Sequence, residues 1–142
     1  MRASETEGPA NLTDARAMAS PSDSPSPQAA PGADLAVDFD HLQRFTMGNR
    51  ALECEVLALF RTQSHSCLER LRQARDDQDW KMAAHTLKGA AAGIGAWAVH
   101  EASQAAERME GETRMSGGAA AIGVLEAAVS ETDAMIAQFL NE

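Results

Sequence analysis

Residues 80–95 read WKMAAHTLKGAAAGIG, and this stretch decides the fold. Its apolar residues recur at intervals of three or four, which is the spacing of one face of an α-helix; they are Trp80, Ala84, Leu87, Ala91 and Ile94. At about 100° per residue, His85 lies roughly 140° from the centre of this face. We therefore predict an amphipathic helix that packs its apolar face on a core and turns His85 toward solvent.

The histidine shares its side of the predicted helix with Lys88 and Gly89, which follow it by one helical turn. An exposed imidazole is partly neutral near pH 7, and its unprotonated ring nitrogen is then a nucleophile. With a phosphoryl donor it would form a phosphoimidazole, and Lys88 would offset the charge of the transferring group. A glycine costs about 1 kcal/mol in a helix interior relative to alanine. We predict that Gly89 gives a partner's active site clearance to reach His85.

The chain is helical in pattern from Asp38 to its end. The spacing predicts a short helix that ends at Gly48 and carries Phe39, Leu42 and Phe45 or Thr46. A long helix follows from about Asn49 to Arg75, and Asp76–Asp79 forms an acidic cap for the His85 helix. A third long helix after Gly95 presents one face, made of Ala98, Ala102, Ala105 and Met109. Gly117-Gly118 separates it from a last helix, which carries Ile122, Leu125, Val129, Met135, Ile136 and Phe139.

No alternating, β-branched run of the strand type occurs, and all five prolines lie at or before position 31. The predicted fold class is therefore all-α, an antiparallel four-helix bundle with a short leading N-terminal helix. Residues 1–34 are rich in Ser, Pro, Ala and Gly and bury too little apolar area to offset their ordering entropy. We predict a disordered tail over residues 1–34 and a helical domain over residues 35–142.

Composition excludes several classes of function. The net charge of −9 argues against nucleic acid as a partner, although Lys81 and Lys88 predict a locally positive patch beside His85. No signal peptide and no apolar stretch of about 20 residues is visible, so we expect a cytoplasmic protein and no membrane partner. Cys54 and Cys67 lie on one predicted helix about 20 Å apart, beyond the reach of a disulfide.

The remaining candidates for chemistry are weak. His41, His65 and His100 form no metalloprotease pair, and we expect them to be ordinary surface or boundary histidines. We expect the large side chains near the motif and on the last helix to serve packing, namely Trp80, Met82, Met109 and Met135.

The segment from Asp38 to about Gly111 resembles a histidine-containing phosphotransfer (HPt) domain. Residues 85–89, His-Thr-Leu-Lys-Gly, together with Gly95 match that family's H-x-L-K-G-x5-G signature. Further counterparts of the family pattern are Phe39, the helix from Asn49 to Phe60, the acidic turn before Trp80, and Met109-Glu110.

The resemblance implies a four-helix bundle that shuttles phosphoryl groups between aspartates of response-regulator receiver domains in a multistep phosphorelay. His85 is then the phosphoacceptor, Lys88 an electrostatic helper and Gly89 the clearance residue. Some family members place a Gln on the neighbouring helix to orient the histidine, and here Gln104 and Glu107 both fall on that helix.

The expected partners are receiver domains and a hybrid histidine kinase. No cofactor is expected in this chain, because Mg²⁺ would be held by the partner receiver. We expect a monomer without kinase activity of its own, and a shallow apolar docking surface from the first helix and residues 52–59. Two alternatives remain: a non-catalytic helical module that docks on a receiver or kinase and sequesters it, and a structural bundle that forms homo-oligomers.

Overall fold

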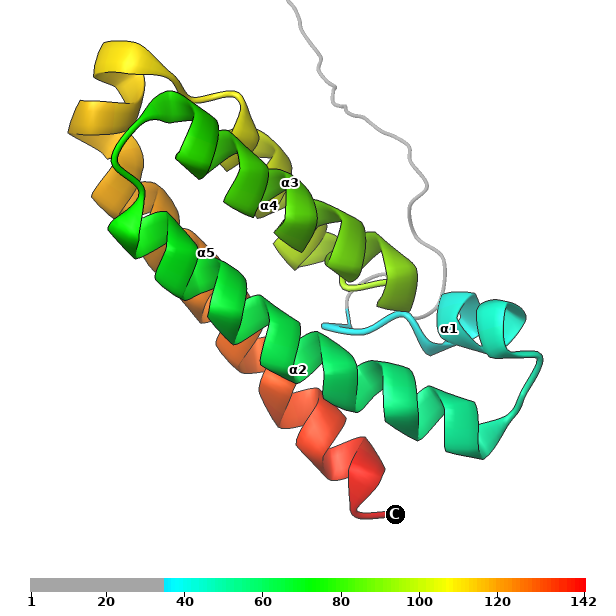
Figure 1. Ribbon diagram of the computed structural model, residues 1–142. Coiled ribbons are helices and arrows are strands. Elements are labelled where there is room, and N and C mark those ends of the chain that lie inside the picture. The colour runs from blue at the N-terminus through cyan, green and yellow to red at the C-terminus, as the bar shows by residue number, and fades with distance from the viewer. Residues whose placement is uncertain (1–34) are drawn as a thin grey trace, which may run out of the picture. The chain divides into compact units, whose positions relative to one another are not determined.

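The computed structural model describes residues 35–142, so the predicted tail over residues 1–34 lies outside the described part of the chain. Its helices are α1 (Phe39–Thr46), α2 (Arg50–Gln73), α3 (Asp77–Ile94), α4 (Trp97–Glu107) and α5 (Gly111–Leu140). Connections of two or three residues join them, which makes consecutive long helices antiparallel. Helices α2 to α5 contact one another in a ring that α5 closes against α2, and α1 packs on α2 and α3 (Figure 1). The predicted four-helix bundle with a short leading helix is confirmed.

The core is built on the predicted apolar face of α3. All five of its residues, from Trp80 to Ile94, are at most 4% exposed. Each other helix of the ring adds buried side chains to the same cluster, including Leu57, Phe60, Leu71, Val99, Ala106, Leu125, Val129 and Ile136. Because α3 buries this face, its opposite face is turned outward.

Side-chain caps set the beginnings of the first three helices. Asp38, Asn49 and Asp76 each accept a hydrogen bond from the backbone N–H three residues further on. Such caps satisfy amide groups that have no partner within the helix. The predicted acidic cap of α3 is therefore confirmed at Asp76.

At its C-terminal end, α3 is bound to the start of α1. Gly95 adopts a φ of 76°, and a Cβ added there would lie 2.8 Å from the Cβ and 2.9 Å from the carbonyl oxygen of Asp38. The Asp38 amide donates to the Gly95 carbonyl at 2.9 Å. Trp97 Nε1 donates to the Asp38 carboxylate at 3.1 Å, which lowers the pKa of that carboxyl, and His41 Nε2 donates to the Ala92 carbonyl at 2.9 Å. The second glycine of the motif thus holds the leading helix in place.

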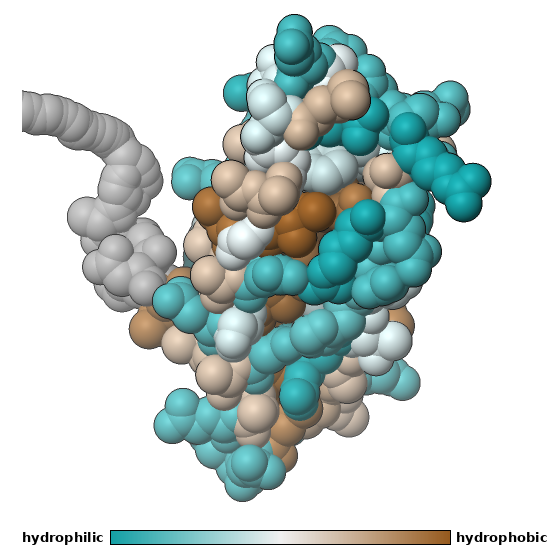
Figure 2. All heavy atoms as spheres, turned by 90° about the vertical axis from the view of Figure 1, so that its left-hand side faces the viewer, coloured by the Kyte–Doolittle hydropathy of each residue, from teal (hydrophilic) through white to brown (hydrophobic). Residues whose placement is uncertain are grey.

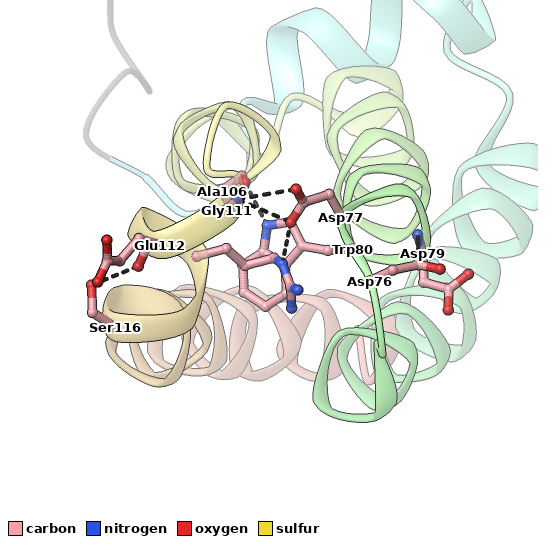
Figure 3. A network of polar contacts seen from close by, with 9 residues as sticks. Asp76, Asp77, Asp79, Trp80, Ala106, Gly111, Glu112 and Ser116 are labelled. Carbon is pink, nitrogen blue, oxygen red and sulfur yellow. Dashed lines mark hydrogen bonds and ion pairs between the residues drawn. The ribbon is translucent and has the colours of Figure 1, made fainter.

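At its N-terminal end, α3 is bound to the turn between α4 and α5 (Figure 3). Asp77 accepts from the Gly111 amide at 3.0 Å and from Arg114 Nε at 2.6 Å. Arg114 and that amide hold the pKa of the Asp77 carboxyl below its usual value. Trp80 Nε1 donates to the Ala106 carbonyl at 2.6 Å, so the largest side chain of α3 leaves no polar group unsatisfied.

The predicted helix break at Gly117-Gly118 is wrong, because α5 runs unbroken from Gly111 to Leu140. A Cβ at Gly118 would lie 3.4 Å from the Trp80 ring, and one at Gly117 would lie 3.0 Å from the Met109 methyl group. Gly118 thus packs against Trp80 at ordinary van der Waals distance, and Gly117 gives Met109 room beside α5. Tertiary packing outweighs their weak helix propensity, which costs about 1 kcal/mol each.

The predicted face of α4 and of the residues after it is confirmed at Ala102 and Met109, which pack against the core, and is wrong at Ala98 and Ala105. The buried residues of α4 are Val99, Ser103 and Ala106, while Ala98 and Ala105 are exposed. The helix ends at Glu107, so it is short and Met109 follows it. Alanine carries too little apolar area to decide which face of a helix is buried, and Val99 decides it here.

Two smaller expectations concern single side chains. Of the alternatives in α1, Thr46 is the buried one and donates to buried Glu53 at 2.8 Å, whereas Phe45 is 61% exposed. Of the core or rim positions expected for Met82, the core position is wrong, since 54% of the residue is exposed.

Figure 2 shows hydrophobic residues exposed in a band between hydrophilic ones on the side of the bundle that faces left in Figure 1. None of the helices between residues 35 and 142 combines the length and the apolar character that a membrane span requires. Cys54 and Cys67 both lie in α2 as free thiols.

Candidate functional site

His85 stands on the outer face of α3, as predicted. Its side chain is 68% exposed, whereas Ala84 and Leu87 beside it in the sequence are fully buried. The rigid helix therefore presents the imidazole to whatever approaches this face.

One carboxylate joins His85 to Lys88. Glu107, near the end of α4, lies 2.9 Å from His85 Nδ1 through Oε2 and 2.8 Å from Lys88 Nζ through Oε1. Its side chain is only 18% exposed. The sequence predicted that Gln104 or Glu107 could orient the histidine. In the structure, Glu107 contacts His85 and Gln104 does not.

The contact with Glu107 decides which imidazole nitrogen is free. The hydrogen bond from Lys88 lowers the pKa of the Glu107 carboxyl, and the bond to His85 adds to this effect against the cost of desolvation. Because an ionised carboxylate only accepts hydrogen bonds, Nδ1 of His85 must carry the proton. In the neutral ring Nε2 then holds the lone pair, so it is the nucleophilic nitrogen.

Nothing within residues 35–142 requires a glycine at position 89. A Cβ added to it would meet nothing within 4 Å, and the residue is exposed. The same holds for Gly93, one turn further along α3 and outside the residues predicted for the site. Positions 85, 89 and 93 are four residues apart, and this spacing was the available signal. Together, Gly89 and Gly93 leave a strip of helix surface without side chains beside the imidazole.

The other histidines lie elsewhere and have local partners. His65 Nε2 contacts Asp133 at 2.6 Å across α2 and α5, and His41 and His100 each pack edge-on against Trp97. Within residues 35–142, no group of three or more His, Cys, Asp or Glu side chains is placed to hold a metal ion. In the segment expected to dock a partner, Leu59 is 61% exposed and Leu52 is half-buried.

Comparison with known proteins agrees with this geometry. The family model described as Hpt domain matches residues 55–141. The chain is similar to the crystal structure of the histidine phosphotransferase ShpA from Caulobacter crescentus, with 33% sequence identity and a TM-score of 0.57. That match covers 75% of this chain and 91% of the other. The comparison with curated proteins found no match. The family match extends through α5, beyond the Gly111 limit of the resemblance noted in the sequence.

Proposed function

Because the chain belongs to the Hpt domain family, we propose that it is a phosphorelay intermediate that carries its phosphoryl group on Nε2 of His85. The group arrives from the aspartyl phosphate of one receiver domain and leaves to the aspartate of another. A hybrid histidine kinase supplies the first of these receivers. The observation that carries the proposal is the exposed imidazole whose Nδ1 is bound to Glu107, which leaves Nε2 as the nucleophile.

In the accepting step, the Nε2 lone pair forms a bond to phosphorus while the bond between phosphorus and the aspartyl oxygen breaks. The released aspartate keeps the electron pair of that bond, and no proton has to move. The ring becomes cationic, with hydrogen still on Nδ1. Glu107 stabilises this cation as the carboxylate of a catalytic triad stabilises its imidazolium.

Lys88 has two roles in this scheme. It holds Glu107 ionised, as the lowered pKa of that carboxyl indicates, and its ammonium group lies one turn from His85, where it offsets phosphoryl charge. The Mg²⁺ that shares this charge belongs to the receiver. Gly89 and Gly93 let the rim of the receiver approach α3 closely enough for in-line transfer.

The test is the acceptance of acid-labile phosphate from a phosphorylated receiver. His85→Gln should reduce acceptance to background, a loss of at least about 1,000-fold, since an amide nitrogen is not a nucleophile. His65→Gln is the matched control, because it removes another exposed histidine that also contacts a carboxylate. Full acceptance by His85→Gln would refute the assignment. Receiver binding without any transfer by the wild type would favour a sequestering module instead.

A further inference from the structure

A hollow of about 450 Å³ opens between α3 and α4 on the Glu107 side of His85. Its lining is polar and consists of Lys81, Lys88, Gln104, Glu107, Arg108 and Glu110. Lys88 and Glu107 also belong to the His85 site, so the hollow adjoins the phosphoryl site directly.

The lining of this hollow carries a net positive charge once its ion pairs are set aside. Lys88 and Glu107 neutralise each other at 2.8 Å. Lys81 and Arg108 form no ion pair with any other described residue, which leaves two cations against the carboxylate of Glu110. This occurs on a chain whose net charge is −9. The positive patch that the sequence predicted at Lys81 and Lys88 is therefore carried by Lys81 and Arg108, because Lys88 is paired with Glu107.

Each of the two cations has a local electrostatic partner. Arg108 follows the last residue of α4, where a positive charge is favoured by the helix dipole. Lys81 lies one turn after Asp77 on α3 and attracts that carboxylate. Asp77 is already bound by the Gly111 amide and by Arg114 Nε, so the Lys81 ammonium can still bind a second anion between itself and Arg108.

We infer that the hollow receives an acidic side chain of the partner receiver, at a subsite separate from the phosphoryl site. This inference rests on the proposed function and adds a determinant of partner choice to it. A carboxylate in the hollow meets the donors of Lys81, Arg108 and the Gln104 amide. This carboxylate enters the hollow beside His85. The Nε2 face of His85 then stays open to the receiver's phosphoacceptor aspartate. Complementary charge of this kind raises the association rate and rejects partners that lack the matching anion.

The test uses the full chain with Lys81→Glu and Arg108→Glu combined. We expect kcat/KM for transfer from a phosphorylated receiver to fall at least tenfold at low ionic strength, mainly through KM. The deficit should shrink toward twofold in about 1 M salt, where the Debye length is about 3 Å. Phosphorylation of His85 by phosphoramidate, a small donor with no docking surface, should stay within twofold of wild type.

The matched control is Arg70→Glu combined with Arg75→Glu. It changes the net charge equally, and neither arginine forms an ion pair within residues 35–142 or lines this hollow. An equal loss in both double variants, or no loss in the first, would overturn the inference while phosphoramidate labelling still supported the phosphoacceptor role. Failure of phosphoramidate labelling in the wild type would instead refute the proposed function.

Discussion

Gly89 and Gly95 lie six residues apart in one motif, but the chain around them treats the two positions differently. At Gly95 the backbone has a φ of 76°, and a Cβ would collide with the backbone of Asp38. At Gly89 a Cβ would meet nothing within 4 Å. One glycine is required by the fold, and the other is required by nothing that residues 35–142 contain. The difference separates a part of α3 that the fold requires from a part that the proposed function assigns to a partner.

The same division holds for the polar groups along α3. At its two ends, Asp77, Trp80 and the backbone of Gly95 are bound by other segments of the chain. In the middle of its outer face, His85 is held through Nδ1 and is otherwise open. The ends therefore hold the bundle together, while the middle is, in the function proposed above, half of a site that a receiver domain completes. Variants that affect one part without the other test this division.

Among the variants that test this division, the largest effect on stability is expected for Gly95→Ala. An alanine at positive φ costs about 1–2 kcal/mol, and its Cβ would also displace Asp38. We expect a loss of about 2 kcal/mol or more in the free energy of unfolding by urea. Gly93→Ala is the control, because the same methyl group there meets nothing within 4 Å. Equal stabilities for the two variants would show that Gly95 is not a structural glycine.

The next effect concerns the chemistry at His85. Glu107→Ala should lower the rate of phosphoryl acceptance about tenfold, which corresponds to about 1.4 kcal/mol in the barrier. Glu107→Gln should recover part of the loss, because its amide oxygen still accepts from Nδ1 without the charge. The ¹⁵N shifts of His85 should show the Nδ1–H tautomer in wild type and a mixture of tautomers in Glu107→Ala.

A control for this pair is Glu101→Ala, an exposed carboxylate on the same helix. It should leave both the rate and the tautomer unchanged. A Glu107→Ala variant with wild-type rate and tautomer would mean that the carboxylate does not position the imidazole.

Gly89→Ala should raise the stability of the fold but lower the rate of transfer from a receiver. Removing an exposed glycine from a helix interior should stabilise the fold by about 0.5–1 kcal/mol. Transfer from a receiver should slow several-fold, because the methyl group occupies space that the partner needs. Phosphoramidate labelling of His85 provides the control and should not change. If transfer from the receiver is as fast as in wild type, Gly89 has no clearance role.

The two parts of α3 also differ in what the sequence could predict. The apolar face from Trp80 to Ile94 and the exposure of His85 follow from helical periodicity and are confirmed. Periodicity misplaced part of the face of α4, because its alanines differ little in apolar area from their neighbours. The glycine pair at 117–118 predicted a break, because the sequence does not show that Met109 and the Trp80 ring pack beside these two glycines.

The contact between His85 and Glu107 was beyond the sequence for a different reason. Gln104 and Glu107 lie three residues apart on α4, so both occupy the same side of that helix. Which of them contacts His85 depends on how α4 is rotated and shifted along its axis relative to α3. A shift of about one helical turn would exchange the two residues. The tie between Asp38 and Gly95 was likewise hidden, because it joins residues more than fifty positions apart.

The smallest effect is a pH dependence at the N-terminal end of α3. The Arg114 guanidinium and the Gly111 amide lower the pKa of Asp77 in the folded state. The stabilisation by its carboxylate is therefore present above the unfolded pKa and is lost as pH falls through the lowered folded pKa.

Asp77→Asn should lower Tm at pH 7 by on the order of 2 °C, because the pair is partly exposed. The difference from wild type should disappear below about pH 3. Asp76→Asn keeps a capping oxygen, and Asp76 pairs with no arginine within residues 35–142, so its effect on Tm at pH 7 should be smaller. A Tm difference for Asp77→Asn that persists at low pH would show that Asp77 stabilises the turn as a neutral hydrogen-bond acceptor and not as a charge.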